Sequence, residues 1–124
     1  MFFIDESKAI HVTRGDAVTF TLTAKENGGE YTFRANDTVR FKVFEKKDCG
    51  CVELQKDFKI EAASQTVDIT LDKEDTKIGG TISKPADYWY EIELNPDIQP
   101  QTIIGYDEDG AKLFRLYPEG GDAE

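Results

Sequence analysis

Residues 87–94, with the sequence DYWYEIEL, constrain the fold of this chain more than any other stretch. Apolar and polar residues alternate along it, which is the period-two pattern of a strand with one buried and one solvent-facing side. The two faces hold Tyr88, Tyr90, Ile92 and Leu94 on one side and Trp89, Glu91 and Glu93 on the other. Turns containing proline bound it at 84–87 and 95–97, since proline cannot donate a ladder hydrogen bond. We therefore expect a central strand with which other strands pair or against which they pack.

Further alternating segments predict the remaining strands. They cover residues 8–13, 17–25, 38–46, 51–60, 65–71, 101–106 and 112–117, with a short extended piece at 31–33. The alternation is clearest in 17–25, and a bulge is expected near Lys56. The last two segments are expected to form a hairpin, because Asp109-Gly110 between them is a strong turn signal.

Residues 72–77 interrupt this pattern, and Asp72 is expected to cap a single helical turn by accepting a hydrogen bond from the amide of Asp75. No segment keeps a 3.6-residue period long enough for a packed helix. The chain is therefore predicted to be all-β, an antiparallel immunoglobulin-like β-sandwich of about seven to nine strands, with an up-and-down barrel as the alternative. Residues 1–118 are expected to form a single β-sandwich domain, and 119–124 a disordered acidic tail.

Composition limits the partners of this domain. Its 124 residues are 39% hydrophobic, which is enough for a real core without disulfide staples. A formal net charge of -10 repels phosphate backbones and anionic membrane surfaces, so neither nucleic acid nor a membrane is an expected partner. The first residues lack the basic region of a signal peptide, and no apolar run approaches the ~20 residues of a membrane helix. We expect a soluble product made in the cytoplasm.

Three kinds of short motif resemble ligand sites, and each has a simpler interpretation as a turn. Cys49-Gly50-Cys51 lacks further soft ligands, because His11 is the only histidine, so a turn with free thiols is expected there. The acidic segment 107–109 and the cluster of Asp72, Glu74 and Asp75 lack the full ligand pattern of a calcium loop, which leaves at most a weak surface site. Arg14-Gly15-Asp16 spells a tripeptide that integrins bind, but a tight turn favours glycine and aspartate in any case.

The sequence offers few parts for catalysis. His11 lies on an alternating strand, and no serine or cysteine has a nucleophile motif such as G-x-S-x-G. The many carboxylates lie in turns and on outward strand faces, where burial would not tune their pKa values. We therefore expect no enzyme, no catalytic residues, no metal and no cofactor.

The only tryptophan marks a candidate contact surface. If Tyr88 and Tyr90 face the core, Trp89 lies on the outer face beside Glu91. Phe44 is also outward by parity, and two outward aromatic residues suit a protein interface or a sugar-stacking platform. The opposite register, with Trp89 in the core and the tyrosines outward, stays open, because periodicity alone settles the register of adjacent aromatic residues poorly.

Four strand motifs follow one another along the chain: RGDAVTFTLT at 14–23, DTVRFKV at 37–43, TLDKEDT at 70–76 and DYWYEIEL at 87–94. In this order they resemble the immunoglobulin-like domain at the N-terminus of phage upper baseplate proteins and related small prophage proteins. The resemblance spans most of residues 14–116 and implies a virion structural or adaptor protein of the tail, baseplate or fibre region, made in the bacterial cytoplasm and assembled into the virion. Its expected partners are other phage tail or baseplate proteins, or further copies of this chain. The family motifs are packing motifs, so no catalytic residue carries over.

The family domain is usually followed by a long C-terminal region that trimerises or binds a receptor. Because this sequence ends at Glu124, an accessory or adaptor role is expected. Two other functions stay open. A carbohydrate-binding module would stack sugars on Trp89, Phe44 and a tyrosine. An acidic inhibitor that mimics nucleic acid would use the net charge, but basic residues scattered over 17–25 and 38–46 argue against it.

Overall fold

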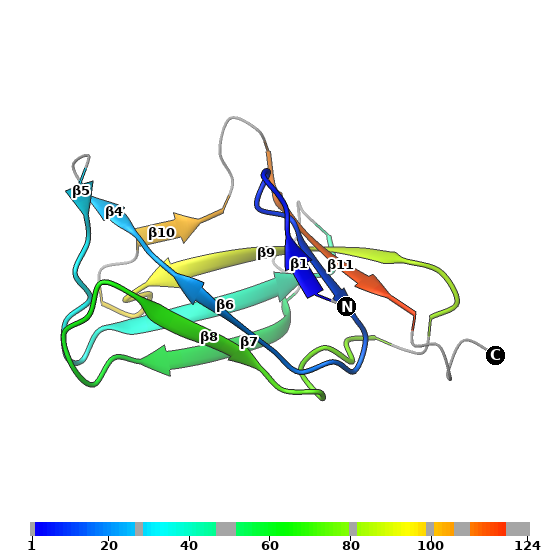
Figure 1. Ribbon diagram of the computed structural model, residues 1–124, viewed down its shortest axis with the longest axis horizontal. Helices are drawn as coiled ribbons and strands as arrows, with labels where there is room; N and C mark the ends of the chain where they lie inside the picture. Colours follow the sequence, from blue (N-terminus) through cyan, green and yellow to red (C-terminus); the bar gives the residue numbers. More distant parts are fainter. Residues whose placement is uncertain are drawn as a thin grey trace.

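The computed structural model describes residues 2–26, 29–46, 52–79, 82–98, 101–105 and 110–118, and its regular elements are all β-strands (Figure 1). This confirms the predicted all-β class. Within these residues, no helix is long and apolar enough to cross a membrane.

The larger sheet contains seven strands in the order β1-β2-β11-β9-β6-β7, with β10 also paired to β9. Their bounds are β1 Phe2–Ile4, β2 Ile10–Thr13, β6 Thr38–Phe44, β7 Val52–Lys59, β9 Ala86–Leu94, β10 Gln101–Ile104 and β11 Lys112–Tyr117. Neighbouring strands are antiparallel except for β2 and β11, which run parallel. The strand predicted to be central is β9, and it does lie in the middle of this sheet (Figure 1).

The second sheet packs across from the first and has only two strands, β3 (Val18–Leu22) and β8 (Val67–Leu71), which are antiparallel. A short hairpin of β4 (Lys25–Glu26) and β5 (Gly29–Glu30) follows β3. Because the described strands form two sheets that pack face to face, beside the separate β4–β5 hairpin, the chain is a sandwich and the alternative of a barrel is wrong.

The core lies between the two sheets and is organised around Phe41 in β6. Its ring centroid lies 5.7 Å from that of Tyr90, 6.1 Å from that of Phe114 and 6.3 Å from that of Phe20 in the opposite sheet. Such tilted and edge-on pairs are the preferred arrangements of aromatic rings. The rest of the core includes the buried rings of Phe33 and Tyr31 and a set of fully buried aliphatic residues: Ile10, Val12, Val39, Val43, Ile69, Leu71, Ile92 and Leu116. The face of β9 that carries Tyr90, Ile92 and Leu94 is buried, as the alternation in 87–94 predicts.

Asp37 ties together the turns that precede β6 and follow β9. Its carboxylate accepts hydrogen bonds from the Tyr31 hydroxyl at 2.7 Å, from the Arg34 amide at 2.9 Å and from Asn95 Nδ2 at 3.1 Å. Asn95 Oδ1 in turn accepts from the Thr38 amide at 2.9 Å. Burial acts to raise the pKa of Asp37, but these hydrogen bonds outweigh it and hold that pKa below its usual range.

The predicted hairpin of 101–106 with 112–117 is wrong. Both β10 and β11 pair with β9, β11 along Ala86–Tyr90 and β10 along Ile92–Leu94, so they share one partner and not each other. Figure 1 shows them toward opposite ends of β9. The nine residues of β9 are long enough to supply backbone partners to both. The proposed turn at 107–109 lies outside the described residues.

Two local predictions in the middle of the chain are also wrong. The bulge expected near Lys56 lies instead where Val43 and Phe44 pair with Leu54 and Val52, whereas Lys56 is in regular register. The cap expected from Asp72 is reversed, because Asp75 Oδ2 accepts from the Asp72 amide at 2.8 Å, in a turn and not a helix. The Asp75 amide donates to the backbone oxygen of Asp72 at 3.0 Å.

Candidate functional site

The outer face of the larger sheet carries the aromatic residues that the sequence singled out. Tyr90 is 4% exposed and belongs to the core, whereas Trp89 is half-buried on the opposite side of β9. The register with Trp89 in the core is therefore wrong. Phe44 is also half-buried and lies directly opposite Trp89 in the pairing of β6 with β9.

Phe44 and Trp89 belong to a longer apolar row that crosses four adjacent strands. Leu113 of β11 lies opposite Trp89, and Val52 of β7 lies opposite Phe44. Directly opposed residues in a sheet have Cβ atoms about 4.5–5.5 Å apart, so each residue of the row lies beside the next. We call Val52, Phe44, Trp89 and Leu113 the apolar row. Val52, at one end, is 43% exposed.

Ion pairs border the apolar row on the side of Lys42. Lys42 Nζ lies 2.6 Å from Glu93 Oε1 and 3.6 Å from Glu91 Oε1, so it bridges two carboxylates of β9. The same ammonium lies 5.6 Å from the ring centroid of Phe44, within the range of a cation–π contact. Glu91, which the sequence placed on the contact surface, is thus held by Lys42 beside that surface.

Arg40 forms a second group of ion pairs one step further along β6. Its guanidinium grips Asp57 with two bonds, Nε to Oδ1 at 2.8 Å and Nη2 to Oδ2 at 3.1 Å. It also donates to Asp97 Oδ2 at 3.1 Å. The hydrogen bond from Arg40 holds the pKa of Asp57 below its usual range.

Arg115 and Asp87 border the apolar row on its other side. Arg115 Nε donates to Asp87 Oδ1 at 2.6 Å and Nη2 donates to Oδ2 at 3.2 Å, a two-bond pair across β11 and β9. The apolar row therefore has satisfied, rigidly paired charges on both sides. Apolar centres with polar rims are the usual anatomy of a protein interface.

A cluster around His11 is the feature that the sequence did not predict. His11 Nε2 lies 2.9 Å from Asp5 Oδ2, its Nδ1 lies 2.8 Å from the Tyr117 hydroxyl, and Phe3 stacks on its ring at 4.3 Å between centroids. The hydrogen bond from His11, together with that from Ser7, holds the pKa of Asp5 well below its usual range.

The order carboxylate, imidazole, hydroxyl resembles a catalytic triad, but the bonds of Asp5 give it a structural explanation. Asp5 Oδ1 also accepts from the amide and hydroxyl of Ser7 and from the Ala9 amide, at 2.7–3.0 Å. The cluster thus fastens the turn between β1 and β2 to Tyr117 at the end of β11. In the sequence, the only signs of this cluster are the outward parity of His11 and the presence of Asp5 six residues before it.

The short motifs have structural roles where they can be seen. In Arg14-Gly15-Asp16, Gly15 has a φ of 89°, its amide donates to Thr76 Oγ1 at 2.9 Å, and Thr76 Oγ1 donates to the Asp16 oxygen at 2.9 Å. Asp72 and Asp75 share the ammonium of Lys56. Among the described residues, no group of three or more His, Cys, Asp or Glu side chains could hold a metal ion. Residues 49–51 lie outside that part of the chain.

These features define a class: an all-β sandwich whose outer face carries an apolar row between ion pairs. Comparison with protein-family profiles, with curated proteins and with solved structures gives no match. The function of the chain is therefore inferred from its own residues and from the order of its strand motifs.

Proposed function

We propose that this chain is a non-enzymatic docking protein of a phage tail, baseplate or fibre assembly, and that it binds its partner through the apolar row. The observation that carries the proposal is the row itself, four apolar residues side by side between the ion pairs of Lys42 and those of Arg115. Strand faces of a sandwich are rigid, so binding there orders few groups and loses little entropy.

The chemistry of this face favours a protein partner. Tryptophan near the centre of an interface, enclosed by contacts that exclude water, is the usual form of a binding hot spot. Asp87 pairs with Arg115, and Glu91 and Glu93 share Lys42, so docking beside these groups buries carboxylates that already contact a cation within the chain. The formal net charge of -10 favours a partner whose rim is basic.

We further propose that the sandwich is of the immunoglobulin-like type. The order β7-β6-β9-β11, packed against β3-β8, corresponds to strands C′-C-F-G packed against B-E of an immunoglobulin variable domain. The motifs in 14–23, 37–43, 70–76 and 87–94 fall on or next to β3, β6, β8 and β9, so the resemblance and the topology point the same way.

The test uses purified tail-tube, baseplate and fibre proteins of a prophage that encodes a chain of this kind, with biolayer interferometry as the assay. Trp89→Ala should weaken binding by about thirtyfold, the effect of losing a hot spot worth about 2 kcal/mol. Phe3→Ala is the matched control, because Phe3 is a 47% exposed aromatic residue on the larger sheet outside the row. A folded Trp89→Ala protein with unchanged affinity for every partner would overturn the proposal.

Carbohydrate binding is the second candidate, because adjacent outward aromatic rings at Trp89 and Phe44 can also stack on a sugar. Trp89 is the only tryptophan, so its fluorescence reports this face alone. Saturable quenching by one member of a bacterial cell-wall glycan panel, lost in Phe44→Ala, would favour this function. Light scattering over a concentration series tests a third outcome, in which the row pairs two or more copies of this chain.

A further inference from the structure

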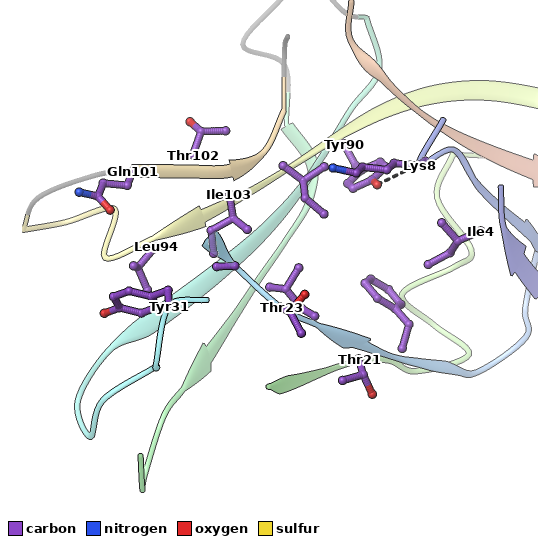
Figure 2. Close-up of a pocket in the computed structure, with 14 residues that line it drawn as sticks. Ile4, Lys8, Thr21, Thr23, Tyr31, Tyr90, Leu94, Gln101, Thr102 and Ile103 are labelled. Carbon is purple, nitrogen blue, oxygen red and sulfur yellow. Dashed lines mark hydrogen bonds between the residues drawn. The ribbon is translucent and has the colours of Figure 1, made fainter. Parts of the chain in front are cut away.

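A cavity of about 470 Å³ opens where the two sheets of the sandwich do not cover each other. Its apolar lining includes Ile4, Leu94, Ile103 and Tyr90, and Figure 2 shows Ile4 across the cavity from Leu94 and Ile103. The cavity exists because the sheets differ in size: the two strands β3 and β8 cannot cover the whole inner face of the seven-stranded sheet. Ile4 pairs with the buried Ile10, yet it remains 41% exposed.

The cavity runs along the edges of two strands. Residues 20–24, from β3 and just beyond, and all four residues of β10 border it, although successive side chains of a strand point to opposite faces. Thr21 and Thr102 point away from the cavity in Figure 2. Consecutive residues can border one space only if their backbones face it, so this is a slot between strand edges.

Both edges are free within the described part of the chain. There, β3 pairs only with β8, and β10 pairs only with β9. Natural proteins usually protect such edges with charges, proline or bulges. The sequence VTFTL of β3 contains no charge and no proline and pairs with β8 in regular register, whereas VELQKDFK of β7, an edge strand of the larger sheet, contains four charged residues. The sequence QTII of β10 also lacks charge and proline, but its pairing with β9 is irregular between Thr102 and Ile104.

The polar groups that face the slot specify the chemistry of its occupant. The hydroxyl of Tyr90 already donates to the Lys8 oxygen at 2.6 Å, and that of Tyr31 donates to Asp37 at 2.7 Å. Lys8, Thr23 and Gln101 add polar side chains to the lining, while apolar side chains form its floor and backbone N–H and C=O groups lie along its edges. Only an extended polypeptide satisfies both the floor and the edges, because a lipid or small apolar ligand cannot pair with a strand edge.

We propose that an extended segment of a partner protein adds as a strand to the free edge of β3, with alternate apolar side chains filling the slot. Ala24 already accepts a backbone hydrogen bond from Tyr31 at 2.8 Å, so residues 20–23 remain for pairing and give the segment a length of about four residues, at about 3.3 Å per residue. The part of the segment that pairs with β3 is uncharged, because β3 and β10 carry no charge and Lys8 is the one charged residue among the described residues that line the slot. The slot does not include the apolar row, so this proposal stands apart from the proposed function.

The test uses a peptide library as the probe. Eight-residue acetylated peptides, with Val, Ile, Leu or Phe at four alternate positions and Thr or Ser between them, are selected against the intact protein. Selected peptides should bind at least tenfold more tightly than versions with a central proline. N-methylation of the peptide's backbone amides should abolish binding when it falls on one set of alternate residues and should leave binding unchanged when it falls on the other set. The reason is that an added strand forms hydrogen bonds through only one of its two edges.

Two variants of matched exposure place the binding site. Ile4→Lys, with Ile4 at 41% exposure in the slot, should weaken peptide binding at least tenfold, whereas Val52→Lys, with Val52 at 43% exposure in the apolar row, should not. In the assay with tail proteins, Val52→Lys should weaken binding and Ile4→Lys should not. Failure of one proposal is therefore distinguishable from failure of the other. Should Ile4→Lys fail to fold, Thr23→Lys places the charge at an exposed position of the same slot.

Three results would overturn the proposal. The first is that no peptide is selected over its proline version. The second is that peptide affinity is unchanged in both slot variants, or unchanged by N-methylation at every position, which would mean that the peptide binds without adding as a strand at this slot. The third is that the protein dimerises in light scattering and Ile4→Lys alone makes it monomeric, which would make a second copy the occupant.

Discussion

Thr76 provides the sharpest test of how the chain holds the turn between β2 and β3. Its side chain is 0% exposed, yet it is polar. Thr76 Oγ1 accepts from the Gly15 amide at 2.9 Å and donates to the Asp16 oxygen at 2.9 Å, with the Lys73 oxygen 3.2 Å away. Thr76→Val keeps the shape but removes both bonds, which leaves a donor and an acceptor without their partner.

The magnitude follows from these contacts. Each buried polar group left unsatisfied costs about 1–3 kcal/mol, and because Gly15 and Asp16 are only half-buried we expect a total near the lower end, about 2–3 kcal/mol. Thr76→Ser keeps the hydroxyl and loses one buried methyl group, at about 1 kcal/mol. The valine protein should therefore be less stable than the serine protein by about 1–2 kcal/mol, although valine is the more hydrophobic residue.

Urea unfolding followed by circular dichroism measures this difference. A loss of 2–3 kcal/mol lowers the midpoint by about 1–2 M for a domain of this size. An unchanged m-value would show that only stability has altered. A valine protein as stable as the serine protein would refute the reasoning, because the two lost hydrogen bonds would then cost no more than the one methyl group that serine lacks.

Two further predictions concern the turn network and the central strand. Because the pKa of Asp37 is lowered in the folded state, the unfolded state binds more protons in acid, so the stability that Asp37 contributes is complete above about pH 5 and is lost as the pH falls through and below 4. The Asp37→Asn variant should therefore have a lower urea midpoint at pH 7, and its midpoint should fall less between pH 5 and pH 3 than that of the parent protein. A variant whose midpoint depends on pH as the parent's does would contradict this. Tyr90→Phe removes the hydroxyl that donates to the Lys8 oxygen and should cost about 1–2 kcal/mol in urea unfolding, while an unaltered midpoint would show that water replaces it there.

Side-chain alternation predicted the strands whose two faces differ in burial. In β6, Val39, Phe41 and Val43 are fully buried while the residues between them are half-buried, so the sequence pattern and the structure coincide. β1 was missed because its sequence, FFI, is apolar at every position and has no period to read. The hairpin of 101–106 with 112–117 was wrong because a turn signal says where a chain reverses but not which strand supplies its hydrogen bonds.

Parity predicted only half of the candidate site. It placed Trp89 and Phe44 on the outer face, but their direct opposition depends on the register of β6 against β9, which no local pattern contains. Val52 shares its sequence parity with Leu54, and only the irregular register beside Val43 brings it opposite Phe44. The partners of His11 were missed for the same reason, because Tyr117 lies 106 residues away in sequence.

The distribution of charge among the edge strands supports the proposed strand addition at the slot. Charged residues make up 32% of the chain, and β7, at the edge of the larger sheet, carries four in eight positions. Charge is absent instead from the strands that border the slot, which are β3, β10 and the edge strand β1, whose Ile4 lines it. An unprotected edge favours aggregation, so a chain gains by leaving one bare only where a partner covers it. A Thr21→Lys variant makes this argument testable: it should resist aggregation on heating better than the parent protein, and equal aggregation would mean that the bare edge of β3 is not a liability.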